Sequence, residues 1–395
     1  MVEDLFSSPT PFTPPTTEED RLSWLRLIRS RRVGTSTFFR LLGEYGSAAA
    51  AIEALPEIAR AAGVKGYAPA APVEVEAEFA AGRTIGAQLI AFGSPDYPAA
   101  LASIPDPPPL LWALGRAELA NRPAVAMVGA RNASSLGTRM ARSLARRLGE
   151  AGFSVVSGLA RGIDAAAHGA ALESGTIAVQ AGGIDTIYPT ENTTLAETIA
   201  TQGLRLSEQP IGMAPQARHF PRRNRIISGL AHAVIVVEAA ARSGSLITAR
   251  DALDQGRDVM AVPGHPFDAR AAGCNALIRD GATLVRGAED VLAALEGATP
   301  PAANAPASGK PPQSAPPRET PAPAPQPPEP RPHSPSETAA LHARILSQLG
   351  PSPLAEDQLI RDLSLPAAQV APVLLSLELE GRITRQPGGL LARLA

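Results

Sequence analysis

Seven short apolar runs, separated by stretches whose apolar residues recur at helical intervals, set the strongest limit on how this chain can fold. The runs are Ala124–Val128, Phe153–Ser157, Ile177–Gln180, Leu204–Leu206, Ala233–Val237, Val259–Val262 and Thr283–Val285. They are apolar along most of their length rather than alternating, as expected of strands covered on both faces. Strands that alternate with helices form a largely parallel sheet with helices on either side. We therefore expect an α/β domain over about residues 86–297.

The segment that precedes this domain is predicted to be helical. Residues 1–17 are rich in prolines and acidic residues and predict a disordered leader. Residues 18–85 show the apolar spacing of short helices, with a glycine turn at Val33-Gly34-Thr35. This pattern predicts a small all-helical, SAM-like domain. The turn is either half of a helix-hairpin-helix, whose backbone amides grip a phosphate, or a plain turn between two helices.

The segment that follows the α/β domain has two parts. Prolines are dense over residues 298–336, which predicts an extended linker without a core. Residues 337–395 resume the pattern of a fold, with three helices and a hairpin typical of a winged helix. The third helix, Pro366–Glu380, contains no Lys or Arg. Because groove recognition of duplex DNA needs cations, a protein-contact or scaffolding role is favoured for this domain.

The composition excludes several classes of function. The only lysines are Lys65 and Lys310, and neither is followed by Ser or Thr, so the chain has no Walker A loop. The six histidines form no pair at metal-ligand spacing, so we expect neither a metal nor a cofactor. The single cysteine, Cys274, and the lack of an apolar run of ~20 residues predict a cytoplasmic protein that is not in the membrane. With a net charge of −2, any nucleic-acid site must be a local basic patch.

Two of the predicted strands lead into glycine-containing loops that could bind an anion. Gly129 and Arg131 follow the strand ending at Val128, where glycine permits close approach of a ligand and arginine can bind a phosphate. Gly158 and Ala160 follow the strand ending at Ser157 and open a helix, whose free amides favour an anion. Ligands bind at this carboxyl edge in open parallel sheets.

Two further segments complete the candidate site. A predicted loop over 218–225 combines four arginines with an aromatic ring, which suits phosphates and an unpaired base. Its candidate nucleic-acid-binding residues are Phe220, Arg222, Arg223, Asn224 and Arg225. A turn after the strand ending at Val237 supplies hydroxyl and amide donors from Ser243, Gly244, Ser245 and Thr248. Four such segments at one sheet edge are much more specific together than any one alone.

Asp164 and His168 could be mistaken for a catalytic acid/base pair. They lie four residues apart and so share one helical face. We expect Asp164 to favour the N-terminus of the helix and His168 to pack against it, both in structural roles. The sequence therefore predicts no catalytic residue.

The motifs at these positions resemble the DNA processing protein A family, also called DprA or Smf, over about residues 88–290. The motifs are VGARNASSLG, SGLARGIDAAAH, AGGIDTIYPTEN, SEQPIG, FPRRNRIISGLA and VVEAAARSGSLITA. The resemblance implies an extended Rossmann-like domain that binds single-stranded DNA in a basic pocket. It further implies a homodimer that brings the RecA recombinase to single strands, displacing single-strand-binding protein, during natural transformation.

The resemblance also implies roles for individual residues. Arg131 would hold a phosphate, and Phe220, Arg222, Asn224 and Arg225 would contact backbone and base. The Ser243–Thr248 turn would cradle another phosphate. Two departures stand out: the family often has serine where Ala130 stands, and it tends to use lysines in a pocket where this chain has arginines.

Two other classes of function are alternatives to a DNA-binding protein that is not an enzyme. The related "lonely guy" phosphoribohydrolases share the fold and use a P-G-G-x-G-T-x-x-E loop with a catalytic glutamate. The corresponding turn here, Ser243–Arg250, lacks that glutamate, and Glu238 is the only carboxylate nearby. The second alternative is a protein-interaction module that binds no nucleic acid, which a binding assay with oligo-dT would separate.

Overall fold

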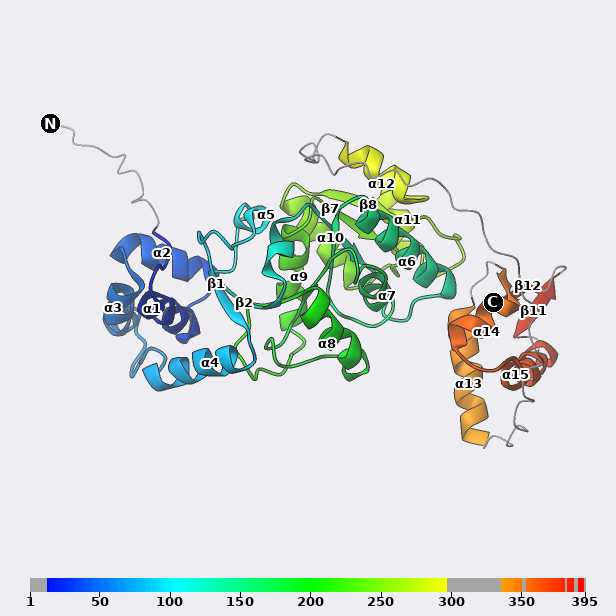
Figure 1. Ribbon diagram of the computed structural model, residues 1–395, viewed down its shortest axis with the longest axis horizontal. Helices are drawn as coiled ribbons and strands as arrows, with labels where there is room; N and C mark the ends of the chain where they lie inside the picture. Colours follow the sequence, from blue (N-terminus) through cyan, green and yellow to red (C-terminus); the bar gives the residue numbers. More distant parts are fainter. Residues whose placement is uncertain (1–12, 297–334, 350–352, 381, 387–389, 394–395) are drawn as a thin grey trace, which may run out of the picture. The chain divides into compact units, whose positions relative to one another are not determined.

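The structure, a computed structural model, describes residues 13–296, 335–349, 353–380, 382–386 and 390–393. These residues belong to two compact units, which are described separately (Figure 1). Residues 1–12 of the predicted leader and 298–334 of the predicted linker lie outside the described residues. The prediction of a disordered leader is wrong for residues 13–17, because Pro15 is buried and Thr17 caps α1. Within the described ranges, no helix is both long enough and apolar enough to cross a membrane.

A nine-stranded sheet forms the centre of the first unit, in the order β1-β2-β6-β5-β4-β3-β7-β8-β9. The strands are β1 (Gln88–Ala91), β2 (Leu110–Gly115), β3 (Ala124–Val128), β4 (Ser154–Ser157), β5 (Thr176–Val179), β6 (Leu204–Ser207), β7 (Ala233–Val236), β8 (Asp258–Ala261) and β9 (Thr283–Leu284). Strands β3 to β9 pair in parallel, which confirms the predicted α/β fold. The chain order reverses at β3, so the crevice between β3 and β7 is the switch point where such sheets usually bind ligands.

The antiparallel strands β1 and β2 were not predicted. They pair with each other, and β2 joins them to β6. The parallel strands were predicted because they alternate with helical segments along the chain. β1 and β2 are not separated by such a helical segment, so this pattern gives no signal for them. They extend the sheet by two strands toward the helical domain.

The helical domain consists of α1 (Glu18–Arg29), α2 (Thr35–Tyr45), α3 (Ala48–Ala61) and α4 (Pro72–Thr84). It packs directly on β2, because Trp112 belongs to the same buried cluster as Trp24 and Phe38. A Cβ atom on Gly82 of α4 would lie 2.4 Å from the Trp112 ring, so only glycine allows this contact. Glu78 adds polar contacts, accepting a hydrogen bond from Trp112 Nε1 at 2.9 Å and pairing with Arg29 at 2.8 Å.

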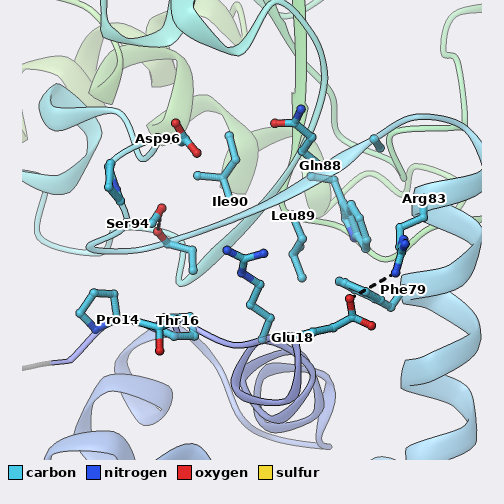
Figure 2. Close-up of a pocket in the computed structure, with 16 residues that line it drawn as sticks. Pro14, Thr16, Glu18, Phe79, Arg83, Gln88, Leu89, Ile90, Ser94 and Asp96 are labelled. Carbon is cyan, nitrogen blue, oxygen red and sulfur yellow. Dashed lines mark hydrogen bonds and ion pairs between the residues drawn. The ribbon is translucent and has the colours of Figure 1, made fainter.

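A cavity of about 500 Å³ lies beside the edge strand β1, between it and the start of α1 (Figure 2). Leu89 and Ile90 of β1 line it, and the ion pair between Arg83 and Glu18, 3.2 Å long, borders it. Its charged lining residues are Glu18, Arg21, Arg83 and Asp96, two of each sign. A balanced lining of this kind offers no excess of positive charge for a phosphate, so this cavity is not our candidate site.

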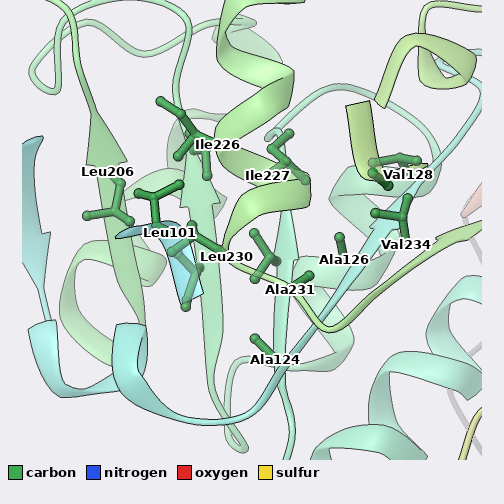
Figure 3. Close-up of a cluster of buried hydrophobic side chains, with 14 of the residues drawn as sticks. Leu101, Ala124, Ala126, Val128, Leu206, Ile226, Ile227, Leu230, Ala231 and Val234 are labelled. Atoms are coloured by element: carbon green, nitrogen blue, oxygen red, sulfur yellow. The ribbon is translucent and has the colours of Figure 1, made fainter. Parts of the chain in front are cut away.

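Helices cover both faces of the sheet, as predicted. Leu101, Ile226 and Leu230 pack with the strands in the main core cluster (Figure 3). Ile177 and Val179 of β5 point into this cluster, whereas Ala178 between them joins a second cluster with α8. The main cluster draws on α5 (Ala99–Ala102), α9 (His219–Gly229), α10 (Ser245–Asp254) and α11 (Ala272–Arg279). The remaining helices are α6 (Ser135–Glu150), α7 (Ile163–Ala170), α8 (Thr193–Gln202) and α12 (Ala288–Leu295), with single 3₁₀ turns at Ala117–Asn121 and Thr190–Asn192.

Helix α6 buries one apolar face against the rest of the α/β domain. Leu144 and Leu148 are buried, whereas Met140 is half-buried and Ala141 and Ala145 complete the apolar side. The arginines at 142, 146 and 147 are exposed, as a solvated face requires. Arg139 is half-buried, so the three exposed arginines are the suitable control positions for tests of DNA binding.

The second unit has the predicted winged-helix fold. Its helices are α13 (Pro335–Gln348), α14 (Glu356–Leu363) and α15 (Ala367–Leu379), and its sheet has the order β10-β12-β11. The strands are β10 (Leu354–Ala355), β11 (Ile383–Gln386) and β12 (Leu390–Arg393). Strand β10 was not predicted. The core is formed by Ile345, Leu359 and Leu374 with their neighbours, and the role of this domain stays a prediction.

Candidate nucleic-acid interface

A small hollow lies at the carboxyl edge of the sheet, where the loops after β3, β4 and β5 meet the first turn of α9. The residues that line it are Arg131, Gly158, Ala160, Arg161, Tyr188, Pro189 and Phe220. Four of the predicted site residues, from three separate segments, are therefore brought together.

Aromatic rings and a guanidinium group are stacked in this hollow. The Tyr188 and Phe220 rings meet edge to face, with centroids 5.7 Å apart. The Arg131 guanidinium lies over the Phe220 ring, 5.3 Å from its centroid. Tyr188 is 48 % exposed, and Arg131 is also exposed. Exposed rings that can stack on a base, next to a cation that can pair with a phosphate, are the elements of single-strand binding sites.

The segment 218–225 was predicted to be a loop, and that prediction is wrong. It forms the first two turns of α9, whose later residues Ile226 and Ile227 pack into the main core. Because a helix turns its successive residues to different sides, Arg222 stays exposed while Arg223, Asn224 and Arg225 are buried. The dense basic patch read from the sequence is thus divided between the surface and the interior.

Arg223 is part of the interior. Its Nη1 donates to the carbonyl oxygen of Gly158 at 2.7 Å and to that of Val179, and its Nε donates to Asn224 Oδ1 at 3.2 Å. Burial lowers the pKa of Arg223 to about 10. A Cβ atom on Gly158 would lie 2.5 Å from this guanidinium. Gly158 therefore leaves the space that the Arg223 guanidinium occupies.

The amides of the same loop are also occupied. Asp164 accepts hydrogen bonds from the backbone amides of Gly158 at 3.1 Å and Ala160 at 3.3 Å. Burial raises the pKa of Asp164, and the nearby Arg223 opposes that rise. The prediction that these amides are free for an anion is corrected, because an internal carboxylate already holds them. Asp164 thus fixes the loop that carries one wall of the hollow.

Arg225 lies in a buried ion-pair cluster. Its Nη2 donates to Glu208 Oε2 at 2.6 Å, and its Nε lies 2.9 Å from Asp106 Oδ2. The Arg225 and Glu208 side chains are only 8 % and 9 % exposed. Arg225 does not line the hollow, and its charge is neutralised inside the protein. We had predicted a phosphate contact for this residue, and the structure instead gives it a structural role.

Glu238 occupies the crevice at the switch point between β3 and β7. It accepts a hydrogen bond from the Ser134 amide at 2.9 Å and another from the Ser134 hydroxyl. Ser134 in turn caps α6, its hydroxyl accepting from the Gly137 amide at 2.9 Å. A Cβ atom on Gly137 would lie 2.4 Å from the Glu238 carboxyl carbon, and one on Gly129 would lie 2.6 Å from Ile163. A carboxylate of the chain itself thus fills this helix N-terminus, and Gly129 serves packing.

The turn over Ser243–Thr248 is not part of the hollow. The Ser243 and Ser245 hydroxyls bond to each other at 2.7 Å, while Gly244 is exposed. Thr248 is 1 % exposed and cannot face a ligand. The predicted helix start is confirmed at Ser245, but the prediction that this turn joins the other loops in one site has no support in the geometry.

His168 is fully buried in a structural network. Its Nε2 accepts a hydrogen bond from the Leu159 amide at 3.3 Å. Its Nδ1 lies 2.7 Å from Thr176 Oγ1 and donates to it, because the Thr176 hydroxyl hydrogen is itself donated to the carbonyl oxygen of Val155. Burial lowers the pKa of His168 to about 3, so the ring is neutral. In the part of the chain that the structure describes, no group of three or more His, Cys, Asp or Glu residues is arranged to hold a metal ion.

Comparison with known proteins identifies the family. Residues 88–296, more than half of the chain, match the family described as DNA recombination-mediator protein A. The chain belongs to the DNA processing protein A family. Residues 18–81 match a DprA-like N-terminal HHH domain, and residues 310–389 match a DprA winged helix domain. All three domains predicted from the sequence therefore have counterparts in this family.

Individual relatives support the assignment to the DprA family. Protein Smf of Synechocystis sp. is 38 % identical over 314 residues, which cover 76 % of this chain and 79 % of the relative. DNA processing protein DprA of Bacillus subtilis is 46 % identical over 215 residues, covering 54 % and 72 %. The crystal structure of DNA processing protein A from Streptococcus pneumoniae aligns with a TM-score of 0.60 at 37 % identity, covering 69 % of this chain and 97 % of that one.

Sequence reasoning missed two of the residues that matter most. Tyr188 lies in the AGGIDTIYPTEN motif, which supported the resemblance without suggesting a role for this ring. An aromatic residue followed by proline, shortly after a predicted strand, was the available signal. Glu238 was noted only as a carboxylate near the glycine turn, and nothing in the spacing indicated its bond to Ser134.

Proposed function

We propose that this DprA family member binds single-stranded DNA. The bases of the strand would stack on Phe220 and Tyr188, and Arg131 would hold a phosphate. The observation that carries the proposal is the arrangement of the exposed Tyr188 and Arg131 around the half-buried Phe220 ring at the carboxyl edge of the sheet. Rings bind bases of any sequence because every base has a π-face. Arg161 also lines the hollow and lies 3.3 Å from Glu191. Arg222 is a further exposed cation on α9, 3.7 Å from Glu208, and does not line the hollow.

Comparing single strands with duplexes tests this proposal directly. Fluorescence anisotropy with labelled oligo-dT and with a duplex of equal length should show tighter binding to the single strand. In a duplex the bases are already stacked on one another, so the rings would gain nothing from them. Equal or tighter binding of the duplex would contradict the proposal and would direct attention to the winged helix.

We further propose that the family role extends to partners. The protein would act as a homodimer, load the RecA recombinase onto single strands and displace single-strand-binding protein during natural transformation. Support comes from membership of a family described as recombination-mediator proteins. RecA filament growth on single strands coated with single-strand-binding protein should start sooner when this protein is added, and should do so less with Arg131→Ala. Unchanged growth would count against the RecA role alone.

An enzymatic role is the weaker alternative. The turn over Ser243–Arg250 lacks the catalytic glutamate of the phosphoribohydrolases. The nearby carboxylate, Glu238, is bound to Ser134, and the neutral ring of His168 is buried. We propose that the protein has no catalytic activity toward nucleotides or DNA and uses no cofactor. The proposal is refuted if the protein hydrolyses a nucleotide and the Glu238→Gln variant loses that activity without a fall in melting temperature.

A further inference from the structure

One aromatic side chain of the α/β domain is almost completely exposed. Phe267 lies in the loop after β8 and is 88 % exposed, the highest fraction among the large apolar side chains of the described residues. Single exposed apolar residues are ordinary on protein surfaces. The position of Phe267 gives it more weight, because its loop leaves the same carboxyl edge of the sheet that carries the hollow.

The loop that carries Phe267 is held in place on both sides of the ring. The Gly264 amide donates to Asn275 Oδ1 at 3.1 Å, and Asn275 Nδ2 donates to the Gly264 carbonyl oxygen at 3.0 Å. Arg270 donates to both carboxylate oxygens of Asp268, at 3.1 and 3.0 Å. A ring on a fixed loop loses little conformational entropy when a ligand stacks on it.

The loops after β3, β7 and β8 leave the sheet next to one another. The three strands are parallel neighbours in the order β3-β7-β8. Hydrogen bonds join the loops: Glu238 after β7 accepts from the Ser134 amide after β3, and the Gly273 amide at the start of α11 donates to the Ala239 carbonyl oxygen at 2.7 Å. Because neighbouring strands lie about 4.8 Å apart, the loops after β3 and β8 begin about 10 Å apart.

Exposed arginines lie on this edge on the way from the hollow to Phe267. Arg131 follows β3 and lines the hollow. Arg242 follows β7, the strand between β3 and β8, and is exposed outside the hollow. Cations that alternate with aromatic rings are the pattern of a groove that follows a single strand. The edge thus offers a ring, two cations and a second ring.

We propose that the bound single strand continues from the hollow along the carboxyl edge of the sheet and stacks one base on Phe267. Arg242 holds a phosphate between the two stacking positions. The inference rests on the proposed function, because it extends the strand that the hollow binds. The loops after β3 and β5 begin about 10 and 20 Å from the loop after β8, a distance of roughly three to six nucleotides at 3.4 Å per nucleotide. The exposed arginines favour a polyanion over a protein partner at this ring.

Photocross-linking of the full chain tests this path directly. The probe is an oligo-dT of about 12 nucleotides with 5-iododeoxyuridine at each position in turn, because irradiation joins this base to an aromatic ring in contact with it. Mass spectrometry of the cross-linked peptides should identify Phe267 as well as Phe220 or Tyr188. An excess of unlabelled oligo-dT should remove all of these cross-links.

Substitutions at Phe267 separate stacking from a general apolar contact. Phe267→Ala should raise the Kd for an oligo-dT of about 20 nucleotides roughly five- to thirtyfold with the same salt slope. Phe267→Trp keeps a flat ring and should bind as the wild type does, whereas Phe267→Leu should bind as weakly as Phe267→Ala. Arg242→Ala should lower the salt slope by about 0.7. Val73→Ala is the control, because Val73 is 69 % exposed on α4 of the helical domain and its loss should leave the Kd unchanged.

The outcomes separate this inference from the proposed function. Cross-links at Phe220 or Tyr188 without any at Phe267, or an unchanged Kd in Phe267→Ala, overturn the inference and leave single-strand binding in the hollow standing. A weaker Kd in Phe267→Ala that comes with a change of molecular mass in light scattering also overturns it, because the ring would then contact another protein chain. If no oligomer binds at all, the proposed function fails and the inference fails with it.

Discussion

Replacing Phe220 with alanine tests whether the hollow is a stacking platform. One part of the Phe220 ring already contacts Tyr188 and Arg131, at centroid distances of 5.7 and 5.3 Å, so only part of its surface can meet a base. Stacking of one base on a protein ring contributes about 1–3 kcal/mol. We therefore expect a loss of about 1–2 kcal/mol, which corresponds to a five- to thirtyfold rise in Kd.

The salt dependence distinguishes this loss from the loss of a charge. Anisotropy titrations with oligo-dT over a range of salt concentrations should give Phe220→Ala the same slope as the wild type, because the ring carries no charge. Arg131→Ala should lower the slope by about 0.7, the value for one phosphate contact with a single strand. Arg142→Ala, at an exposed position of α6 outside the lining of the hollow, is the control and should bind normally.

Two results would refute this placement of the site. If Phe220→Ala binds oligo-dT with unchanged affinity, the ring does not stack on a base. If Arg142→Ala weakens binding while Arg131→Ala does not, the strand lies along the outer face of α6 and not at the carboxyl edge of the sheet.

Three further predictions concern stability. Arg225→Ala leaves Glu208 buried without its partner and should lower the free energy of unfolding, measured in urea, by about 3–5 kcal/mol. Arg222 is exposed, so Arg222→Ala should change this free energy by less than about 1 kcal/mol. Gly158→Ala forces a methyl group against the Arg223 guanidinium and should cost about 1–3 kcal/mol; an unchanged melting temperature would show that Arg223 can move freely. Burial lowers the pKa of His168 from 6.5 to about 3. Between these pH values the ring takes up a proton in the unfolded chain but not in the folded protein, so the free energy of unfolding should fall as the pH drops from about 6.5 toward 3. His168→Gln should flatten that part of the stability curve, and an equally steep curve in this variant would assign the dependence to other groups.

The parallel strands could be predicted because each is an apolar run bounded by helical segments. The seven predicted runs agree with β3 to β9 to within one residue at each end. The antiparallel strands β1 and β2 were not predicted because their environment comes from the helical domain, through contacts such as that of Gly82 with Trp112. Contacts between residues far apart in sequence leave no local pattern.

The candidate site was predicted in part, for a similar reason. Arg131 and Phe220 could be found because glycine loops and aromatic residues next to arginines are local signals. The roles of Arg223 and Arg225 could not, because a cluster of arginines looks the same whether it faces solvent or carboxylates such as Asp164 and Glu208. Burial decides between these environments, and burial depends on the helix that the apolar residues Ile226 and Ile227 draw onto the core.

The shared packing of Trp24 and Trp112 has a practical consequence for spectroscopy. They are the only tryptophans in the chain, and both lie in the cluster that joins the helical domain to β2, at 3 % and 1 % exposure. Intrinsic tryptophan emission therefore reports on that junction and not on the hollow, whose fluorophore is Tyr188. An unfolding curve followed by emission will detect separation of the helical domain from the sheet, and circular dichroism will detect loss of the helices in both units. An emission change that precedes the loss of circular dichroism would show that the junction opens before most of the helices are lost.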